Sequence, residues 1–159
     1  MEIRTPKNIV EAYKIASQVV SMEFEEKSTA FEKVIDFCER SHSCRMENSL
    51  KRNTLLFWAY NKCAQAKFDV QRFDEAVDMW LKAIELTEIA TAKIEIGDKI
   101  LKSLEQGDVK ISVKAKLIAK VASIVGEACQ KTGQQEKALR MQRLQNTAEF
   151  VLNPSKFKH

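Results

Sequence analysis

Residues that interrupt helices are scarce in this chain. Its 159 residues include only four glycines and two prolines. An all-β chain needs a turn signal roughly every 8–12 residues, and this sequence does not supply them. Hydrophobic residues make up 45% and charged residues 30%, a balance typical of globular proteins and not of disordered ones. The scarcity therefore argues against an all-β fold and favours an all-α fold.

Long apolar runs are absent as well. No stretch approaches the roughly 18 consecutive apolar residues of a membrane-spanning helix, and the N-terminus lacks the apolar core of a signal peptide. We expect a soluble, cytoplasmic protein without a membrane partner. The four cysteines belong to a chain long enough to fold without disulfides. We therefore expect Cys38, Cys44, Cys63 and Cys129 to be reduced thiols.

Motifs for catalysis are lacking too. The chain has two histidines, one of which is the last residue. It contains no glycine-rich phosphate loop, no nucleophile elbow and no metalloprotease helix motif. Clustered carboxylates such as Asp74 and Glu75 are expected on solvated helix faces. We predict no catalytic residue and no cofactor, and hence a protein that is not an enzyme.

One short cluster has the chemistry of a metal site, Cys38-x3-His42-x-Cys44. Two thiolates and an imidazole are zinc ligands, but zinc takes four of them in a tetrahedron. The fourth ligand has to come from elsewhere, for example from Cys63. The spacing fits none of the familiar paired-cysteine patterns. The alternative is a core Cys38 followed by a polar loop between helices.

Positive charge is concentrated in the last third of the chain. Residues 107–159 contain ten Lys and Arg against four Asp and Glu, whereas residues 1–106 contain 16 against 18. These basic residues have two possible roles. They either form a solvated helical face without a partner or form a surface that binds an acidic partner. In that second case, a nucleic-acid-associated regulator uses the basic helices of residues 110–147 to contact phosphates, although Phe150 is the only aromatic nearby for base stacking. The candidate residues are Lys114, Lys116, Lys120, Lys137, Arg140 and Arg143.

Apolar residues recur at spacings of three and four, which predicts about seven amphipathic helices. Short connections make neighbours antiparallel. We expect one helical domain over residues 1–152 and a tail over residues 153–159. The helices are predicted after Thr5-Pro6, from a capping Thr29 to about 40–43, over 47–68, 72–89 and 91–105, from Asp108 to Thr132-Gly133, and from there to Asn153-Pro154.

Two segments share a pattern of small residues at an offset of 62 positions. The offset places Ala64 opposite Gly126, and Ala76 opposite Ala138. It also places Gln71 opposite Gly133. Small residues thus occur in both helices of each hairpin, where backbones approach closely.

This pattern resembles the tetratricopeptide repeat, which is built from helical hairpins. Residues 57–88 carry Ala64, Phe73, Ala76, Trp80 and Ala83, but Gln71 replaces the turn glycine and Glu88 the closing proline. Residues 119–150 carry Gly126, Gly133 and Ala138. They depart from the pattern at Gln135 and Gln142, where aromatics are expected, and at Gln145. Because 62 is not a multiple of the 34-residue period, the helix over 91–105 is expected to be irregular.

The resemblance implies a module that binds another protein or a peptide along the first helix of each hairpin, as an adaptor, chaperone or regulator. Adjacent aromatics near Phe57 cannot all face inward, because successive helical residues point about 100° apart. Either Trp58 or Tyr60 then reaches a binding groove, or flanking helices bury both. An uncapped last helix can also pair with its copy in a homodimer. The predicted partner-binding residues are Trp58, Tyr60, Asn61, Lys62, Gln65, Lys116 and Lys120.

Overall fold

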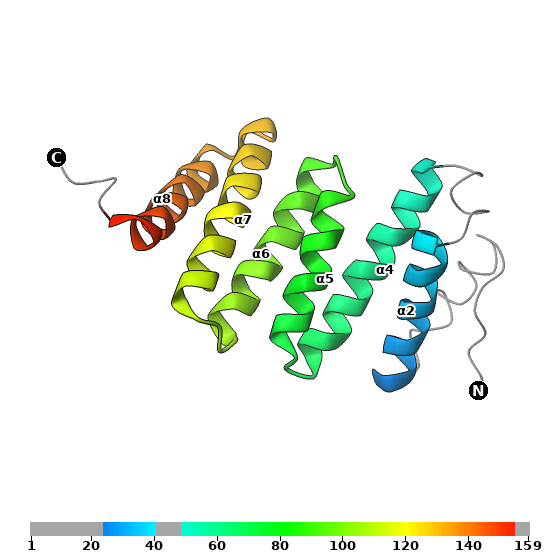
Figure 1. Ribbon diagram of the computed structural model, residues 1–159. Coiled ribbons are helices and arrows are strands. Elements are labelled where there is room, and N and C mark those ends of the chain that lie inside the picture. Colours follow the sequence, from blue (N-terminus) through cyan, green and yellow to red (C-terminus); the bar gives the residue numbers. More distant parts are fainter. Residues whose placement is uncertain (1–23, 41–48, 155–159) are drawn as a thin grey trace. The chain divides into compact units, whose positions relative to one another are not determined.

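The structure, a computed structural model, describes residues 24–40 and 49–154 (Figure 1). Within these ranges every regular element is a helix and no strand occurs. The all-α prediction is confirmed to this extent. The helix predicted after Thr5-Pro6 and residues 155–159 of the predicted tail lie outside the described residues. The helices are α2 (Phe24–Arg40), α4 (Ser49–Asp69), α5 (Phe73–Glu85), α6 (Ala90–Gln106), α7 (Ile111–Lys131) and α8 (Gln135–Leu152).

Helix boundaries follow the apolar periodicity with three differences. Helix α7 begins at Ile111 with Lys110 as its N-cap, so the start predicted at Asp108 is wrong. Helix α2 begins at Phe24, so Thr29 lies inside it and the predicted cap there is wrong; the glutamates and lysine before Thr29 are good helix formers and extend the helix. Helix α5 ends at Glu85, and four residues separate it from α6, which begins at Ala90. None of the described helices is both long enough and apolar enough to cross a membrane.

The chain divides into two compact units, Met1–Thr87 and Glu88–His159. We call them the first and second unit and describe each by itself. The first contains α2, α4 and α5, and the second contains α6, α7 and α8. In each, the middle helix packs against both of the others. A single domain over residues 1–152 remains a prediction.

The core of the first unit lies around α4. Leu55, Leu56, Ala59 and Cys63 of this helix are buried in one cluster with residues of α2. A charged residue is buried beside them. Lys67 is only 5% exposed, and its Nζ lies 3.9 Å from a carboxylate oxygen of Glu32 in α2 and 3.7 Å from one of Glu75 in α5. Lys67 therefore links all three helices of this unit.

The turn between α4 and α5 has the hydrogen bonds of a Schellman motif. The N–H of Arg72 donates to the carbonyl of Lys67 (2.8 Å), and that of Gln71 donates to Phe68 (2.9 Å). Gln71 has a positive φ of 65°, a conformation that costs an L-residue about 1–2 kcal/mol. The motif satisfies the last carbonyls of α4 at the expense of this strain.

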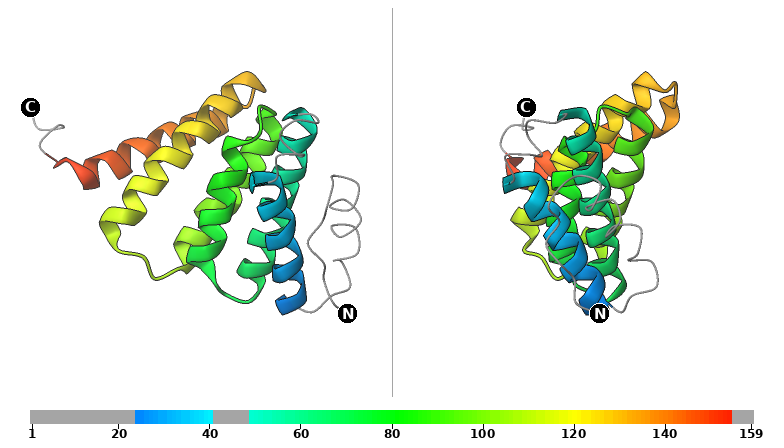
Figure 2. Two further views of the ribbon diagram at one scale, coloured as in Figure 1. Left: turned by 45° about the vertical axis from the view of Figure 1, so that its right-hand side comes forward. Right: turned by 90° about the vertical axis from the view of Figure 1, so that its right-hand side faces the viewer.

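The turn between α7 and α8 is built in the same way. The N–H of Gln134 donates to the carbonyl of Cys129 (2.8 Å), and that of Gly133 donates to Gln130 (3.3 Å). Gly133 has a φ of 76° and occupies the position that the 62-residue offset assigns to Gln71. Figure 2 shows the antiparallel course of α7 and α8. The two hairpins thus share one turn geometry, with glycine at the strained position of only one of them.

The second unit depends on close contact between α6 and α7. Gly97, in the middle of α6, is buried; a Cβ placed on it would lie 2.1 Å from Cγ2 of Val125 and 3.5 Å from Cγ1 of Val121. Glycine here costs helix propensity, which is why the sequence alone gives little support to this helix. The gain is that Val121 and Val125 of α7 are fully buried.

Candidate functional site

Tyr60 is a core residue of the first unit. It is 3% exposed, its hydroxyl donates a hydrogen bond to Oε1 of Glu39 in α2, and the ammonium of Lys82 lies 5.6 Å from the centre of its ring. The sequence left open whether the aromatics of α4 reach a binding groove or are buried by flanking helices. Tyr60 is buried. A partner cannot reach this side chain in the folded unit.

Trp58 is half-buried against α2. Its ring meets that of Phe31 edge to face, with centres 5.4 Å apart and planes at 66°. Such aromatic contacts contribute about 0.5–1.5 kcal/mol beyond the area buried. Trp58 therefore has a packing role that accounts for its place on α4.

The remaining α4 candidates are mostly engaged inside the first unit. Asn61 Oδ1 accepts a hydrogen bond from the indole N–H of Trp80 (3.0 Å). Gln65 Nε2 donates to Asp69 Oδ1 (2.9 Å), and Lys62 is exposed. The α4 part of the predicted binding surface is thus largely an aromatic packing site.

The α7 part is different, because Lys116 and Lys120 are both exposed. They are four residues apart and so lie on one side of α7. Ser123 and Glu127, also exposed, continue the same line at further steps of three and four. We call these four residues the α7 face.

The basic residues of the predicted nucleic-acid patch point in several directions. Lys114 is half-buried and Lys116 exposed. Lys137 pairs with Asp98 of α6, Nζ to Oδ2, at 2.5 Å. Arg140 and Arg143 are exposed on α8, whose buried Ala138 and Ala148 face the helix packed on it. By helical geometry Arg143 projects roughly opposite to that packed side, so the six residues do not share one face.

Helix α8 also exposes apolar side chains. Leu139 and Phe150 are 59% and 51% exposed, and Val151 and Leu152 more than 40%. Leu139 and Phe150 are eleven residues apart, which places them on one side of the helix. These are the residues that a homodimer through the last helix would bury.

The predicted metal cluster is only partly visible. Cys38 is buried in α2 and forms no disulfide with another described residue, whereas His42 and Cys44 lie outside the described residues. Among the residues that are described, no three His, Cys, Asp or Glu side chains gather where they could hold a metal ion. Cys63 and Cys129 are likewise buried and outside any disulfide of the described residues. Burial raises the pKa of the Cys129 thiol, and nearby charges on Lys137, Asp98 and Arg140 modify that effect.

A hollow between α7 and α8, of about 180 Å³, is a feature that the sequence reading missed. Side chains with hydroxyl, amide or carboxylate groups dominate its lining, and two of them, Ser123 and Glu127, belong to the α7 face. Ala122, Ser123, Gly126, Glu127 and Gln130 of α7 line it together with Ala138, Gln142 and Gln145 of α8.

The first unit fills the equivalent place with aromatic rings. The offset of 62 residues relates Gln142 to Trp80, Gln130 to Phe68 and Ala122 to Tyr60. In the first unit the rings of Phe68 and Trp80 lie 5.9 Å apart, and Trp80 and Tyr60 are buried. Replacement of large rings by alanine and glutamine accounts for an open hollow in one hairpin and a packed core in the other. Of the departures from the repeat, the one at Gln142 was the sequence signal for it.

Hydrogen bonds along α8 orient two of the glutamines. Gln142 Nε2 donates to Asn146 Oδ1 (3.1 Å), and Gln145 Nε2 donates to Glu149 Oε1 (3.2 Å). With an amide nitrogen of each engaged in this way, its Oε1 carbonyl is left to accept. The Ser123 hydroxyl adds a further acceptor, and Glu127 also lines the hollow, although its carboxylate pairs with Lys131. The hollow is therefore rich in hydrogen-bond acceptors.

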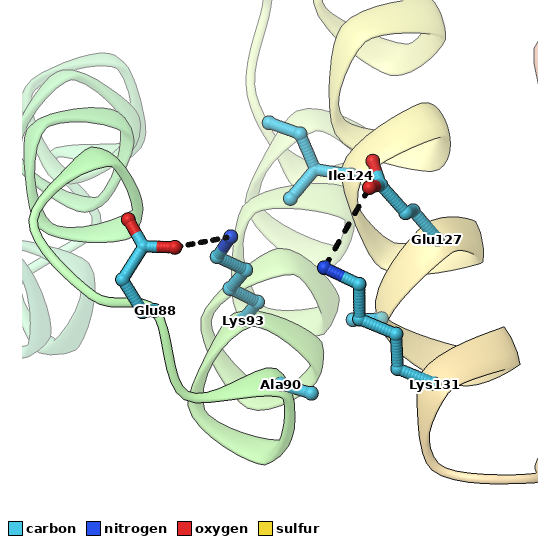
Figure 3. A pocket seen from close by; sticks show the side chains of 7 residues that line it. Glu88, Ala90, Lys93, Ile124, Glu127 and Lys131 are labelled. Carbon is cyan, nitrogen blue, oxygen red and sulfur yellow. Dashed lines mark ion pairs between the residues drawn. The ribbon is translucent and has the colours of Figure 1, made fainter.

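A smaller cavity of about 60 Å³ lies between α6 and α7. Two ion pairs border it (Figure 3): Lys93 with Glu88 at 4.0 Å, and Lys131 with Glu127 at 3.7 Å. Its two ammonium groups are matched by two carboxylates, so it offers no net charge to a ligand. The α7 face and the adjoining α7–α8 hollow are the stronger candidate site.

Comparisons with known proteins add no relative. No protein-family model matches this chain, and neither a curated protein nor a solved structure shows a significant match. Function must therefore be argued from the site alone.

Proposed function

We propose that this chain is a non-enzymatic helical-repeat module that binds another protein or a peptide, as an adaptor, chaperone or regulator in the cytoplasm. Two hairpins with the same Schellman turn and matching small residues at a constant offset support a repeat-like stacking of tetratricopeptide type. The three-helix units α2–α4–α5 and α6–α7–α8 have the same order of packing, which supports it further.

One observation carries the binding role. Positions that are packed with aromatic rings in α4–α5 are alanine and glutamine in α7–α8, and an open polar hollow lies there. A purely structural hairpin gains stability by filling such a place, since a buried large apolar side chain contributes about 1.5–3 kcal/mol. The exposed Lys116 and Lys120 beside it add long side chains for polar contacts with a partner.

Affinity capture from the native host with three baits tests this proposal. The baits are the wild-type chain, a charge-reversed α7 face (Lys116→Glu with Lys120→Glu), and a control reversed on the far side of α8 (Arg143→Glu). We expect a partner that the wild type and the control both retain and that the α7 variant loses, with direct binding repeated from purified components. Equal capture by all three baits would contradict a binding site on the α7 face.

A nucleic-acid-associated regulator is the second candidate, and the exposure of Arg140 and Arg143 on α8 favours it. Phosphate contacts make affinity fall steeply with salt. In this case Arg143→Glu weakens binding to arbitrary DNA or RNA, and binding at low salt disappears at high salt. A partner that resists nuclease treatment and moderate salt excludes this alternative for that interaction.

A further inference from the structure

The α7–α8 hollow corresponds, at the 62-residue offset, to a place in the first unit that holds flat groups. Its counterpart in the first unit holds the planar side chains of Phe68 and Trp80, with Asn61 accepting the indole N–H at 3.0 Å. Ser123 stands in the position of Asn61 and lines the hollow. In the first unit the equivalent place is thus already occupied by planar groups, and one of them, the indole of Trp80, donates a hydrogen bond.

The lining decides what kind of planar group fits. The lining includes three glutamines, a serine and a glutamate. An aromatic ring placed among them would displace water from their polar groups without replacing the lost hydrogen bonds. Each unsatisfied group of this kind costs about 1–3 kcal/mol. A guanidinium is equally flat, donates five N–H bonds in a fixed plane and accepts none. The hollow offers it Ser123 Oγ and the side-chain amide oxygens of Gln130, Gln142 and Gln145. The Glu127 carboxylate, which pairs with Lys131 on the α6 side (Figure 3), has to turn toward the hollow to add a charged acceptor.

The surrounding charges permit a cation. Glu127 stands on the α7 side of the hollow, and Glu149 follows Gln145 by one turn on the α8 side. Lys120 and Lys131 flank them on α7. Lys131 lies 3.7 Å from Glu127 (Figure 3), but both side chains are well exposed, and exposed pairs of this kind contribute only about 0–1 kcal/mol. A guanidinium can therefore displace Lys131 from Glu127 at small cost.

We propose that the α7–α8 hollow binds the guanidinium of an arginine side chain presented by the polypeptide partner. This inference rests on the proposed polypeptide-binding function and names the residue that the site selects. A lysine side chain should bind the hollow less tightly than arginine because its ammonium is compact and not planar. Citrulline has the same shape as arginine without the charge, so it forms weaker bonds with the Glu127 carboxylate.

Nuclear magnetic resonance on the labelled full chain tests the site directly. The probes are four capped pentapeptides of glycine that carry arginine, lysine, citrulline or tryptophan at the centre. We expect saturable shifts of the Gly126 amide and of the side-chain amides of Gln130, Gln142 and Gln145 with the arginine peptide. Affinity should fall about tenfold for lysine and for citrulline, which corresponds to the loss of one charge-assisted hydrogen bond.

Three variants separate the site from a general surface effect. Gln142→Trp restores the ring that the first hairpin has and closes the hollow, so it should abolish the shifts. Gln142→Met keeps the side-chain length and removes the acceptor, and should weaken binding about tenfold, the equivalent of one such bond. Gln135→Met makes the same exchange at an exposed glutamine outside the lining and should leave binding unchanged. Circular dichroism of each variant checks that it is folded.

Two results would overturn the assignment. One is the absence of saturable shifts at the four reporter groups, and the other is equal or tighter binding of the lysine, citrulline or tryptophan peptide. The capture experiment tests the proposed polypeptide-binding function independently of the arginine site. If a captured partner is lost with the charge-reversed α7 face but binds Gln142→Met as tightly as wild type, polypeptide binding stands and the arginine site is wrong.

Discussion

Gly97 provides the sharpest test of how the second unit is packed. A Cβ added to this residue would lie 2.1 Å from Val125 Cγ2, well inside the 3.4 Å at which ordinary contact begins. Valine in a helix holds one rotamer about 90% of the time, so it cannot readily turn away. Either α6 must move from α7 or Val125 must adopt a strained rotamer. Overpacking of this kind costs about 1–3 kcal/mol.

Gly126 is the matched control. It also lies inside a helix, but an added Cβ there would only reach ordinary contact with Met141 Cβ at 3.4 Å and the Ala138 carbonyl at 3.9 Å. Replacing glycine by alanine in a helix interior gains about 1 kcal/mol, and this gain is common to both sites. We therefore expect Gly126→Ala to stabilise the protein by up to about 1 kcal/mol, and Gly97→Ala to be less stable than Gly126→Ala by about 1–3 kcal/mol.

Urea unfolding followed by circular dichroism measures the difference. With a slope near 2 kcal/mol per molar urea, the two midpoints should differ by about 0.5–1.5 M. Adding Val125→Ala removes the clashing methyl groups, so Gly97→Ala should be far less damaging in that background, as a coupling between contacting residues requires. If Gly97→Ala is as stable as Gly126→Ala, the close approach of α6 and α7 is not what requires this glycine.

Three substitutions test the turns and the core, and pH and alkylation test a thiol. Gln71→Gly should raise stability by about 0.5–1 kcal/mol because Gln71 has a positive φ, and Gly133→Ala should lower it by about as much; opposite signs in thermal unfolding are required. Tyr60→Phe loses the hydrogen bond to Glu39 and should cost about 1 kcal/mol, whereas a neutral result in urea would mean that this bond contributes nothing. Burial raises the pKa of Cys129, so the folded state keeps the thiol protonated while the unfolded chain ionises near its usual pKa. Stability from this group should therefore be intact below that pKa and decline as pH rises above it. Alkylation mapped by mass spectrometry should be slow at Cys129 until urea unfolds the chain, and fast labelling of the native protein would show that the thiol is accessible.

Local patterns in the sequence predict the helices because their boundaries depend on nearby residues. Apolar spacing and the pair Thr132-Gly133 place the end of α7 correctly. Gln71 carries no such signal, since only its position opposite Gly133 indicates a left-handed residue there. In its local sequence, Gly97 only lowers the helix propensity of its segment. Its benefit depends on Val125, 28 residues later, and no local pattern contains that contact.

The candidate site was harder to predict than the helices. Trp58 and Tyr60 of α4 are two positions apart and so point about 160° apart, but which one is buried depends on the position of α2. The hydroxyl of Tyr60 finds a partner there in Glu39. Charge counts likewise could not tell that Lys137 pairs with Asp98 on another helix while Arg140 stays exposed. Exposure is a tertiary property, so a list of basic or aromatic residues overestimates the surface available to a partner.

The exchange of aromatics for glutamines in the second hairpin is compatible with folding because glutamine forms helices well. Helices α7 and α8 therefore persist although the space between them on one side is open. The stability that Trp80 contributes in the first hairpin has a different source in the second, where Gly97 lets Val121 and Val125 of α7 become fully buried against α6. Each such side chain contributes about 1.5–3 kcal/mol. The packing of α7 against α6, together with its remaining contacts to α8, thus keeps the helix in place although polar side chains line the hollow.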